Sequence, residues 1–233
     1  WVCRIGGIDV QAGVEGGKDI AWEELERRHD AVFVGMGLGP DRRLPGADLD
    51  GVDGAVAWIE KMKLGSVSLA GVRSAVVLGG GNTAMDCLRE LAGLGVPEVT
   101  MVYRGTPEGM SGYKHEWEAA KKLGVRGIFG ATPAGFVGEG RVSGVRFKTA
   151  EGEQEIPAQL VLLAIGQARL GEQLRPLGIQ ADASGRLIAD VQGALSRPRW
   201  YAGGDCTNGG MEVVNAVAEG KAAALSIHRA MGV

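Results

Sequence analysis

Apolar runs alternate with glycine-rich turns along this chain, and their spacing predicts alternating strands and helices. The clearest case is the stretch of residues 74–104, SAVVLGGGNTAMDCLRELAGLGVPEVTMVYR. Its apolar run at 75–78 predicts a strand, and the apolar positions after the glycines fall three or four apart, as on one helix face. Those positions are Met85, Leu88, Leu91 and Ala92. A second strand at 99–103 follows, so this stretch predicts one βαβ unit.

The rest of the pattern predicts elements on both sides of this unit. Before it, we expect a short strand pair, a helix near residues 22–28, a strand at 31–35, and a helical stripe within 51–63. After it, we expect a helix at 113–123, a hairpin or meander at 128–148 and a covered strand at 159–166. A weak strand at 187–191, a strand at 200–203 and a helix at about 212–231 complete the chain. The alternation indicates an α/β fold.

The last predicted helix has an apolar stripe that contains a glycine. The stripe consists of Val213, Ala216, Val217, Gly220, Ala224 and Ile227. Glycine inside a helix costs about 1 kcal/mol relative to alanine. Gly220 therefore predicts that another backbone segment passes close to the helix.

The glycines of the central unit follow the pattern G-x-G-x-x-A. Gly79 would form the tight turn, Gly81 would let the backbone approach a pyrophosphate, and Ala84 would let the helix pack on the strand. A phosphate would bind the free N–H groups at the helix start, near Asn82 and Thr83. The alternative is a glycine-rich turn that only connects a strand to a helix. A second turn of this kind, GGD at 203–205, precedes the last helix and predicts another ligand-binding turn.

Composition excludes several classes of function. The chain has 233 residues, 45% of them hydrophobic and 23% charged, as in an ordinary globular protein. A net charge of −3 with scattered basic residues argues against a nucleic-acid partner. The longest apolar run, at 160–165, is far shorter than the roughly 20 residues of a membrane span. We therefore expect no membrane association and a cytoplasmic location.

The residues that often carry catalysis or metals give no site here. Cys3, Cys87 and Cys206 form no C-x-x-C pair, which argues against a disulfide framework, a metal site and a dithiol redox centre. His115 is interpreted as a solvated helix residue instead of a general base. No catalytic residue is identified. Because the chain starts at Trp1, we expect it to be part of a longer protein.

Five motifs in order resemble a known flavoprotein family. They are GGGNTAMD, VTMVYR, AIGQ, YAGGD and EVVNAVAEGKAAA. Together they resemble the family of the glutamate synthase small subunit, to which the flavin- and NADPH-binding part of dihydropyrimidine dehydrogenase also belongs. The resemblance implies a Rossmann-like NAD(P)H-binding domain at residues 72–168, inserted into a partial FAD-binding domain at residues 1–65 and 170–233. The strands at 31–35 and 200–203 should then share one sheet.

The resemblance also implies cofactors and partners. FAD and NADP (or NAD) would be bound, and electrons would pass from NAD(P)H through FAD to an iron–sulfur partner or a large catalytic subunit. An iron–sulfur cluster would lie only in a preceding N-terminal part or in that partner. The family's iron–sulfur cysteines and its FAD-binding G-x-G-x-x-G unit are not found in this sequence. We therefore expect this piece to lack the segment that holds the ADP half of FAD.

In the flanking parts, the resemblance assigns the FAD-binding residues. Gly37 would lie near the FAD pyrophosphate, and Gly204 and Asp205 near its ribityl chain and pyrophosphate, with Asp205 accepting a hydroxyl hydrogen bond. The N–H groups at the start of the last helix would stabilise negative charge on the reduced flavin. The residues expected against the flavin are Glu212, Val213 and Ala216. Gly166, in the AIGQ motif, is also counted among the cofactor-binding residues.

Arg104 is the candidate for cofactor selection. NADP-binding folds place an arginine near the 2′-phosphate, whereas NAD-binding folds place a carboxylate there. Here Tyr103-Arg104 ends the second strand, and the first carboxylate beyond it is Glu108. We therefore predict a preference for NADPH, although Gly105 stands where the family tends to have a second arginine. The alternative is a solvated loop arginine.

Two other functions stay open. The chain could be a nucleotide-binding scaffold or interaction subunit without turnover, although the intact Gly79, Gly81 and Asp205 argue against this. It could also reduce small disulfides or quinones, which the missing C-x-x-C pair disfavours. The leading hypothesis is an oxidoreductase module that passes hydride from NAD(P)H to FAD.

Overall fold

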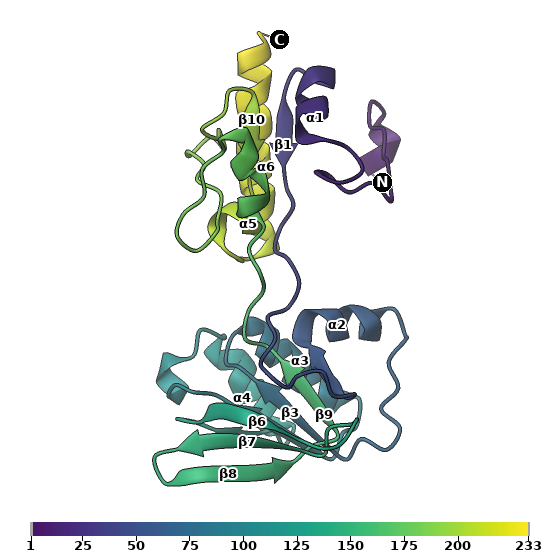
Figure 1. Cartoon of the computed structure of the whole chain (residues 1–233), viewed down its shortest axis with the longest axis vertical. Coiled ribbons are helices and arrows are strands. Elements are labelled where there is room, and N and C mark those ends of the chain that lie inside the picture. Colours follow the sequence, from purple (N-terminus) through teal and green to yellow (C-terminus); the bar gives the residue numbers. More distant parts are fainter. Residues whose placement is uncertain (1, 233) are drawn as a thin grey trace. The chain divides into compact units, whose positions relative to one another are not determined.

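The chain forms two compact units in the computed structural model, which describes residues 2–232 (Figure 1). The central unit is Pro40–Ala168. The terminal unit combines the segment that ends at Gly39 with the segment that begins at Arg169. The chain therefore passes between the two units twice.

A parallel sheet of five strands forms the middle of the central unit, in the order β2-β9-β3-β4-β5. The strands are β2 (Val52–Gly54), β3 (Ser74–Leu78), β4 (Glu98–Val102), β5 (Arg126–Ile128) and β9 (Leu160–Leu163). The helices of this unit are α2 (Ala55–Lys63), α3 (Asn82–Gly93), η2 (Pro107–Gly109) and α4 (Lys114–Lys122). The βαβ unit predicted at 74–104 is confirmed, because β3 pairs with β4 in parallel and α3 connects them.

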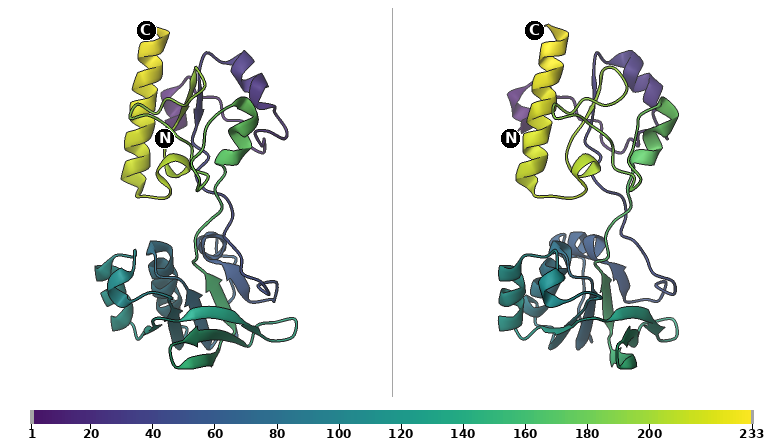
Figure 2. Two further views of the ribbon diagram at one scale, coloured as in Figure 1. Left: turned by 60° about the vertical axis from the view of Figure 1, so that its left-hand side comes forward. Right: turned by 90° about the vertical axis from the view of Figure 1, so that its left-hand side faces the viewer.

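Alternate side chains of the sheet serve two separate cores. Val77 of β3 packs with the helices, among Trp58 of α2, Leu88 of α3 and Trp117 of α4. Val76 points to the other face, where an antiparallel sheet covers it. That sheet consists of β6 (Thr132–Val137), β7 (Gly144–Thr149) and β8 (Gly152–Pro157). Figure 2 shows the parallel sheet between these two layers, which explains why β9 is apolar on both faces.

The first unit boundary differs from the one that the sequence suggested. Residues 40–65 belong to the central unit, because β2 pairs with β9 and Trp58 is buried in the helix-side core. The boundary that the resemblance implied, between residues 65 and 72, falls in a connection within the unit. The chain divides at 39/40 and at 168/169.

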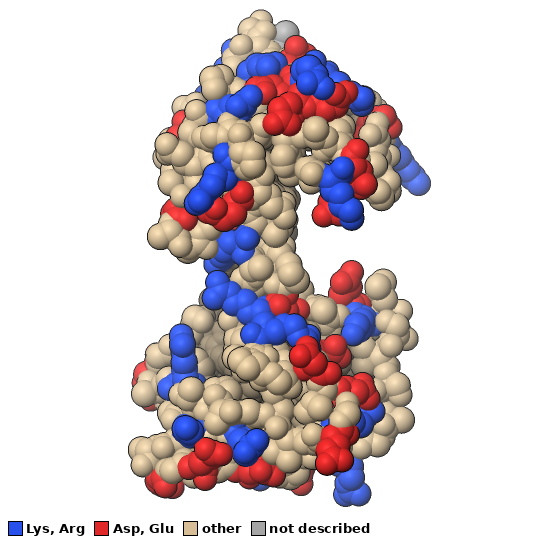
Figure 3. Space-filling view, in the orientation of Figure 1, with Lys and Arg blue, Asp and Glu red and all other residues tan. Residues whose placement is uncertain are grey.

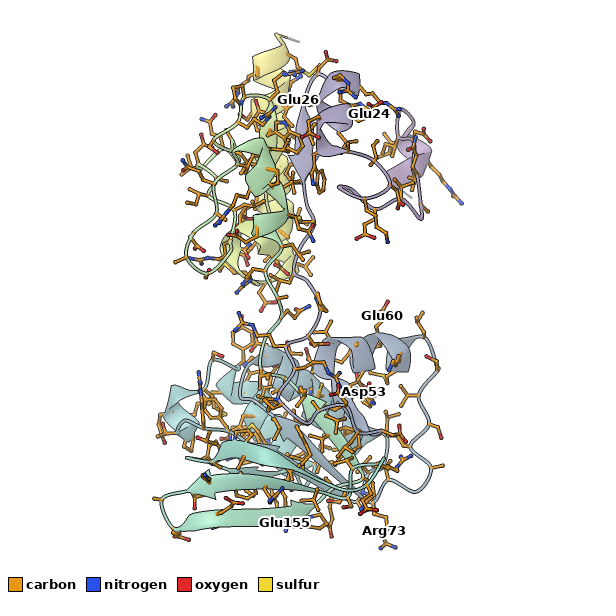
Figure 4. All side chains as sticks on the ribbon, viewed as in Figure 1. Glu24, Glu26, Asp53, Glu60, Arg73 and Glu155 are labelled. Atoms are coloured by element: carbon orange, nitrogen blue, oxygen red, sulfur yellow. The ribbon has the colours of Figure 1, made fainter. Side chains whose placement is uncertain are left out.

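In the terminal unit, two parallel strands pair: β1 (Val32–Val34) and β10 (Trp200–Ala202). The prediction that the strands at 31–35 and 200–203 share one sheet is confirmed. The helices of this unit are η1 (Val2–Ile5), α1 (Trp22–Arg28), η3 (Gly171–Leu177), α5 (Asp205–Asn208) and α6 (Val213–Met231). Glu26 of α1, labelled in Figure 4, accepts hydrogen bonds from Arg197, and this pair holds α1 to the loop before β10.

Two local predictions for the terminal unit were wrong, and one helix was missed. The strand pair expected before residue 22 is a 3-10 helix and an exposed loop with one bridge between Gly16 and Ile20. The weak strand at 187–191 is reduced to one bridge from Leu187 to Ala181, and η3 was not foreseen. An extended segment forms a strand only when a neighbouring strand pairs with its backbone N–H and C=O groups. Within the part of the chain described, these two segments have no such neighbour beyond the single bridges.

The predicted stripe on α6 is only partly buried. Val213 and Val217 are 78% and 65% exposed. The predicted close approach of another backbone segment is confirmed, because a Cβ on Gly203 would lie 3.1 Å from Glu219 Cβ and 3.4 Å from Gly220 N. A Cβ on Gly220 itself would meet nothing within 4 Å, so the approach depends on the missing side chain of Gly203 and not on that of Gly220.

Basic and acidic side chains are interspersed on the face seen in Figure 3. Each unit has ion pairs of its own, such as Arg141 with Asp50 at 2.8 Å and Arg186 with Asp182 at 2.8 Å. Within residues 2–232, no helix combines the length and the apolar composition that crossing a bilayer requires.

Candidate functional site

The turn between β3 and α3 is built from three glycines with different surroundings. Gly79 has a φ of 137°, and a Cβ there would lie 2.1 Å from the Ala164 carbonyl oxygen. A Cβ on Gly80 would lie 2.8 Å from the Tyr103 ring. At Gly81, by contrast, the nearest atom to a Cβ is Ser111 Oγ at 3.5 Å. The first two glycines are therefore required by packing, whereas the third leaves open space beside the turn.

Free N–H groups follow this turn. Gly81 is the N-cap of α3, and Gly81 O accepts hydrogen bonds from Ala84 N–H at 3.0 Å and Met85 N–H at 3.1 Å. The N–H groups of Asn82 and Thr83 come before these bonds in the first helical turn, so they are available to an anion. Ala84 is fully buried against the sheet.

The loop between β4 and α4 is held on the glycine turn. Gly112 N–H donates to Gly80 O at 2.9 Å, and Tyr113 N–H donates to Asn82 Oδ1 at 3.0 Å. The Asn82 side chain thus holds this loop, a role that the sequence did not predict. Farther along, Tyr103 Oη donates to Gly109 O at 3.1 Å.

Several predicted site residues of the central unit lie at one edge of the sheet. Gly79 follows β3, Arg104 lies just beyond β4, and Gly166 follows β9. These three strands are adjacent and parallel, so their carboxyl ends share an edge. Arg104 is exposed, with no ion pair or hydrogen-bond partner in the described part of the chain. Ligands of open α/β sheets bind at this edge.

In the terminal unit, the turn after β10 is fastened to α6. Gly204 has a φ of 81°, and its N–H donates to Glu219 Oε2 at 2.6 Å. Glu219 also accepts hydrogen bonds from Thr207 Oγ1 at 3.1 Å and from Asn208 Nδ2 at 3.0 Å. Asp205 begins α5, and its Oδ1 accepts from Met211 N–H at 3.3 Å.

Glu219 was not among the predicted site residues. It occurs in the motif AVAEGK, and its polar position four residues before the buried Ala223 is a signal that could have indicated an inward-facing carboxylate. No sequence pattern indicated which groups Glu219 would bind, because they lie 11–15 residues away.

The start of α6 lies beside this turn. A Cβ on Gly204 would lie 3.5 Å from Ala216 Cβ. Glu212 and Asn215 form a capping box, in which Glu212 N–H donates to Asn215 Oδ1 at 3.2 Å. The Glu212 side chain in turn accepts from the Asn215 N–H, so one of the N–H groups expected to face a flavin is already bonded. Val213 is exposed on the helix surface.

The turn after β1 meets the turn after β10 at Cys206. Cys206 Sγ lies 3.5 Å from Val34 O and 3.3 Å from Gly203 O. Burial raises the pKa of the Cys206 thiol, and a hydrogen bond with the Gly37 backbone opposes this effect. Gly37 has a φ of 62°, and a Cβ there would meet nothing within 4 Å. The predicted residues of the terminal unit therefore gather around two neighbouring turns.

The cysteines and acidic residues do not gather into a metal site within the described residues. All three cysteines are free, Cys3 on the surface and Cys87 and Cys206 in the interior. Burial raises the pKa of Cys87 to about 12, so this thiol stays protonated at neutral pH. His115 is exposed and stacks on Tyr113, with ring centroids 5.5 Å apart.

Comparison with known proteins places these turns in a family. A family model described as pyridine nucleotide-disulphide oxidoreductase matches residues 7–220. The glutamate synthase [NADPH] small chain of Halomonas elongata is 35% identical over 93% of this chain and 53% of its own length. The NAD-dependent dihydropyrimidine dehydrogenase subunit PreT of Escherichia coli O157:H7 is 32% identical over 95% of this chain and 52% of its own length.

The solved structures support the same fold. FprA of Mycobacterium tuberculosis, in complex with NADPH, has a TM-score of 0.72 at 20% identity, with coverage of 94% of this chain and 67% of that chain. This chain spans about half the length of the curated relatives it matches. The matched residues include both glycine turns, so the chain belongs to the pyridine nucleotide-disulphide oxidoreductase family.

Proposed function

We propose that this chain is the NAD(P)H-binding part, with a portion of the FAD-binding part, of an oxidoreductase that passes hydride from NAD(P)H to FAD and electrons onward to an iron–sulfur partner. The observation that carries the proposal is the open side of Gly81, next to the free N–H groups of Asn82 and Thr83. The proposal is supported by two relatives, the glutamate synthase [NADPH] small chain and a subunit of an NAD-dependent dihydropyrimidine dehydrogenase. A cytoplasmic location is part of the proposal.

The central unit fits a dinucleotide. A pyrophosphate needs N–H donors and a backbone without a Cβ on the side of approach. The turn offers both, since a side chain at Gly81 would occupy the open space. Arg104 would bind the 2′-phosphate of NADPH, and Gly166 would border the site from the neighbouring strand.

The terminal unit fits part of a flavin nucleotide. Asp205 would accept a hydrogen bond from a ribityl hydroxyl, and Gly204 and Gly37 would leave room for the pyrophosphate. Val213 and Ala216 would lie against the ring system, since the start of α6 exposes apolar side chains there. When bound, the nicotinamide and flavin supply the hydride and electron transfer, and this chain's residues bind and orient them.

A scaffold without turnover is the second candidate. It is favoured by the small sheet of the terminal unit, which has two strands among the residues described. Such a unit could bind nucleotide weakly and act through its partner. Electron transfer separates the two candidates: with FAD added in excess under anaerobic conditions, the oxidoreductase should speed the loss of flavin absorbance on addition of NADPH, whereas a scaffold should not.

The decisive experiment is a titration of the whole chain with NADPH and NADH by calorimetry. We expect Gly81→Val to abolish binding while the circular dichroism spectrum stays unchanged, because the added side chain fills the open space. Gly93→Ala, at the opposite end of α3, is the matched control, since a Cβ there would meet nothing within 4 Å. Equal affinity of Gly81→Val and the unaltered chain would contradict the proposal.

A further inference from the structure

The hydroxyl group of Ser111 lies on the open side of the glycine turn. Ser111 Oγ is 3.5 Å from the position that a Cβ on Gly81 would occupy, and no other atom lies within 4 Å of that position outside the adjoining residues. In the G-x-G-x-x-A pattern, the second glycine of the pattern is Gly81, and its missing Cβ marks the side from which a pyrophosphate approaches. The hydroxyl therefore borders the space that a pyrophosphate would fill.

Both neighbours of Ser111 are fixed to the structure. Gly112 N–H donates to Gly80 O at 2.9 Å, and Tyr113 N–H donates to Asn82 Oδ1 at 3.0 Å. On the other side, Met110 packs against the helix-side core. The segment that carries the hydroxyl is thus held in place before any ligand binds.

Gly112 shows how closely the loop approaches the turn. A Cβ on Gly112 would lie 3.0 Å from Met85 Cγ and 3.1 Å from Gly80 O. A larger residue would therefore push the loop, and Ser111 with it, away from the turn. The glycine lets Ser111 come within reach of the ligand side of Gly81.

The chemistry of Ser111 suits a phosphate group. A serine hydroxyl has one donor hydrogen, and phosphate oxygens accept such hydrogen bonds. Ser111 is exposed, and its Oγ has no hydrogen-bond partner in the described part of the chain. By contrast, Thr106 in the same loop uses its Oγ1 to cap Gly109 N–H at 3.2 Å.

We propose that Ser111 is a further dinucleotide-binding residue that donates a hydrogen bond to the pyrophosphate. This inference rests on the proposed NAD(P)H site. Because both nicotinamide dinucleotides contain the pyrophosphate, Ser111 contributes equally to NADH and NADPH. Arg104, at the 2′-phosphate, affects NADPH alone.

The test compares the dissociation constants of NADPH and NADH for three variants of the whole chain. Ser111→Ala removes the hydroxyl and should weaken both nucleotides about ten-fold, the usual effect of losing one hydrogen bond to a charged group. Ser111→Thr keeps a hydroxyl and should restore most of the affinity. Ser68→Ala removes an exposed hydroxyl elsewhere in the central unit and should change neither constant.

Three other outcomes would each overturn the assignment of Ser111 to the pyrophosphate, and they differ in what they mean for the proposed function. Unchanged affinities of Ser111→Ala, with measurable binding by the unaltered chain, would overturn the role of Ser111 and leave the proposed function intact. Loss of NADPH affinity alone would place the hydroxyl at the 2′-phosphate and overturn the pyrophosphate assignment. Absence of binding by the unaltered chain would overturn the proposed function, and this assignment with it.

Discussion

The backbone N–H of Gly204 donates a 2.6 Å hydrogen bond to Glu219 Oε2, across 15 positions of sequence. The same carboxylate accepts hydrogen bonds from the side chains of Thr207 and Asn208. One side chain of α6 thus fixes the turn that begins α5 and presents Asp205. Glycine suits this position because its φ of 81° lies in the left-handed region, which a residue without a Cβ adopts readily.

Replacing Glu219 should therefore destabilise the terminal unit. In Glu219→Ala, the partly buried N–H of Gly204 and the side chain of Asn208 lose their acceptor, at a cost of about 1–3 kcal/mol in unfolding free energy. The Thr207 hydroxyl keeps Gly204 O as an acceptor at 2.8 Å. Glu219→Gln keeps one acceptor oxygen and should lose less. Urea unfolding followed by tryptophan fluorescence measures the difference. Lys221→Ala, on the exposed part of the same helix, is the control, and an equal effect in both would contradict this role for Glu219.

The sequence predicted those parts of the fold whose pattern is local. The residues of α3 repeat at helical spacing, and β9 is apolar on both faces, so both elements could be placed before the structure was known. The contacts of Glu219 and Asn82 could not be predicted in the same way. Each joins segments that are distant in the sequence, and no periodicity indicates which backbone groups a polar side chain will bind.

The prediction of the first unit boundary was wrong for a related reason. The glycines at 65 and 71 resemble a linker, but Trp58, which precedes them, is buried against the parallel sheet. Burial of a large aromatic side chain outweighs a local turn signal, because it contributes several kcal/mol. Only the pairing of β2 with β9 shows where residues 40–65 belong.

Gly79 and Gly81 should respond differently to alanine. Gly79→Ala forces a Cβ to 2.1 Å from the Ala164 carbonyl oxygen at a φ of 137°, so we expect a loss of about 2 kcal/mol or more in unfolding free energy. The Cβ added by Gly81→Ala would lie 3.5 Å from Ser111 Oγ, which is an ordinary contact. This variant should therefore change the unfolding free energy by no more than about 1 kcal/mol. Thermal unfolding of both variants tests this contrast. A larger loss for Gly81→Ala would mean that the third glycine is also required by packing.

The three thiols should differ in reactivity. Cys3 is exposed, whereas Cys87 and Cys206 are buried and burial raises the pKa of both thiols. Because the thiolate is the reactive form, Ellman's reagent at pH 8 should modify Cys3 quickly and the other two only after unfolding. The variant Cys3→Ser should show almost no fast reaction. Fast modification of that variant would show that an interior thiol is accessible.

The raised pKa of Cys87 should make the unfolding free energy fall at alkaline pH. Its pKa in the folded chain, about 12, lies above the ordinary value of 9.0. The unfolded chain therefore loses this proton first as pH rises, so the contribution of Cys87 is complete below pH 9 and is lost between about pH 9 and 12. Urea unfolding at pH 7.5 and pH 10 should show a larger decrease in the unaltered chain than in Cys87→Ala. An equal decrease would show that other groups cause the loss.

Asp41 should stabilise the start of α2. Its carboxylate accepts hydrogen bonds from Val56 N–H at 3.2 Å and Ala57 N–H at 3.0 Å, so it caps this helix from a distant part of the chain. Asp41→Ala should lower the unfolding free energy by about 1 kcal/mol, and Asp41→Asn should restore part of it. Asp48→Ala, an exposed carboxylate nearby in sequence, is the comparison, measured by urea unfolding. Equal values for the two alanine variants would exclude a capping role.

Arg104 should select between the two nicotinamide dinucleotides. It lies just beyond β4, beside the strand that ends in the glycine turn, and no carboxylate in the described residues pairs with it. Its guanidinium can form two parallel hydrogen bonds with a phosphate, worth about 1.5–3 kcal/mol. Arg104→Ala should therefore weaken NADPH binding by roughly 10- to 150-fold and leave NADH binding unchanged.

Salt dependence adds an independent test of this role. The proposed contact between Arg104 and the 2′-phosphate would be an exposed ionic interaction, so added salt should weaken NADPH binding more than NADH binding. In Arg104→Ala, the two nucleotides should show more nearly the same salt dependence. Arg126→Ala, an exposed arginine on β5 of the same sheet, is the matched control. If NADH binds the unaltered chain as tightly as NADPH, or if Arg104→Ala leaves the affinity ratio unchanged, then Arg104 is a solvated loop residue that does not select the cofactor.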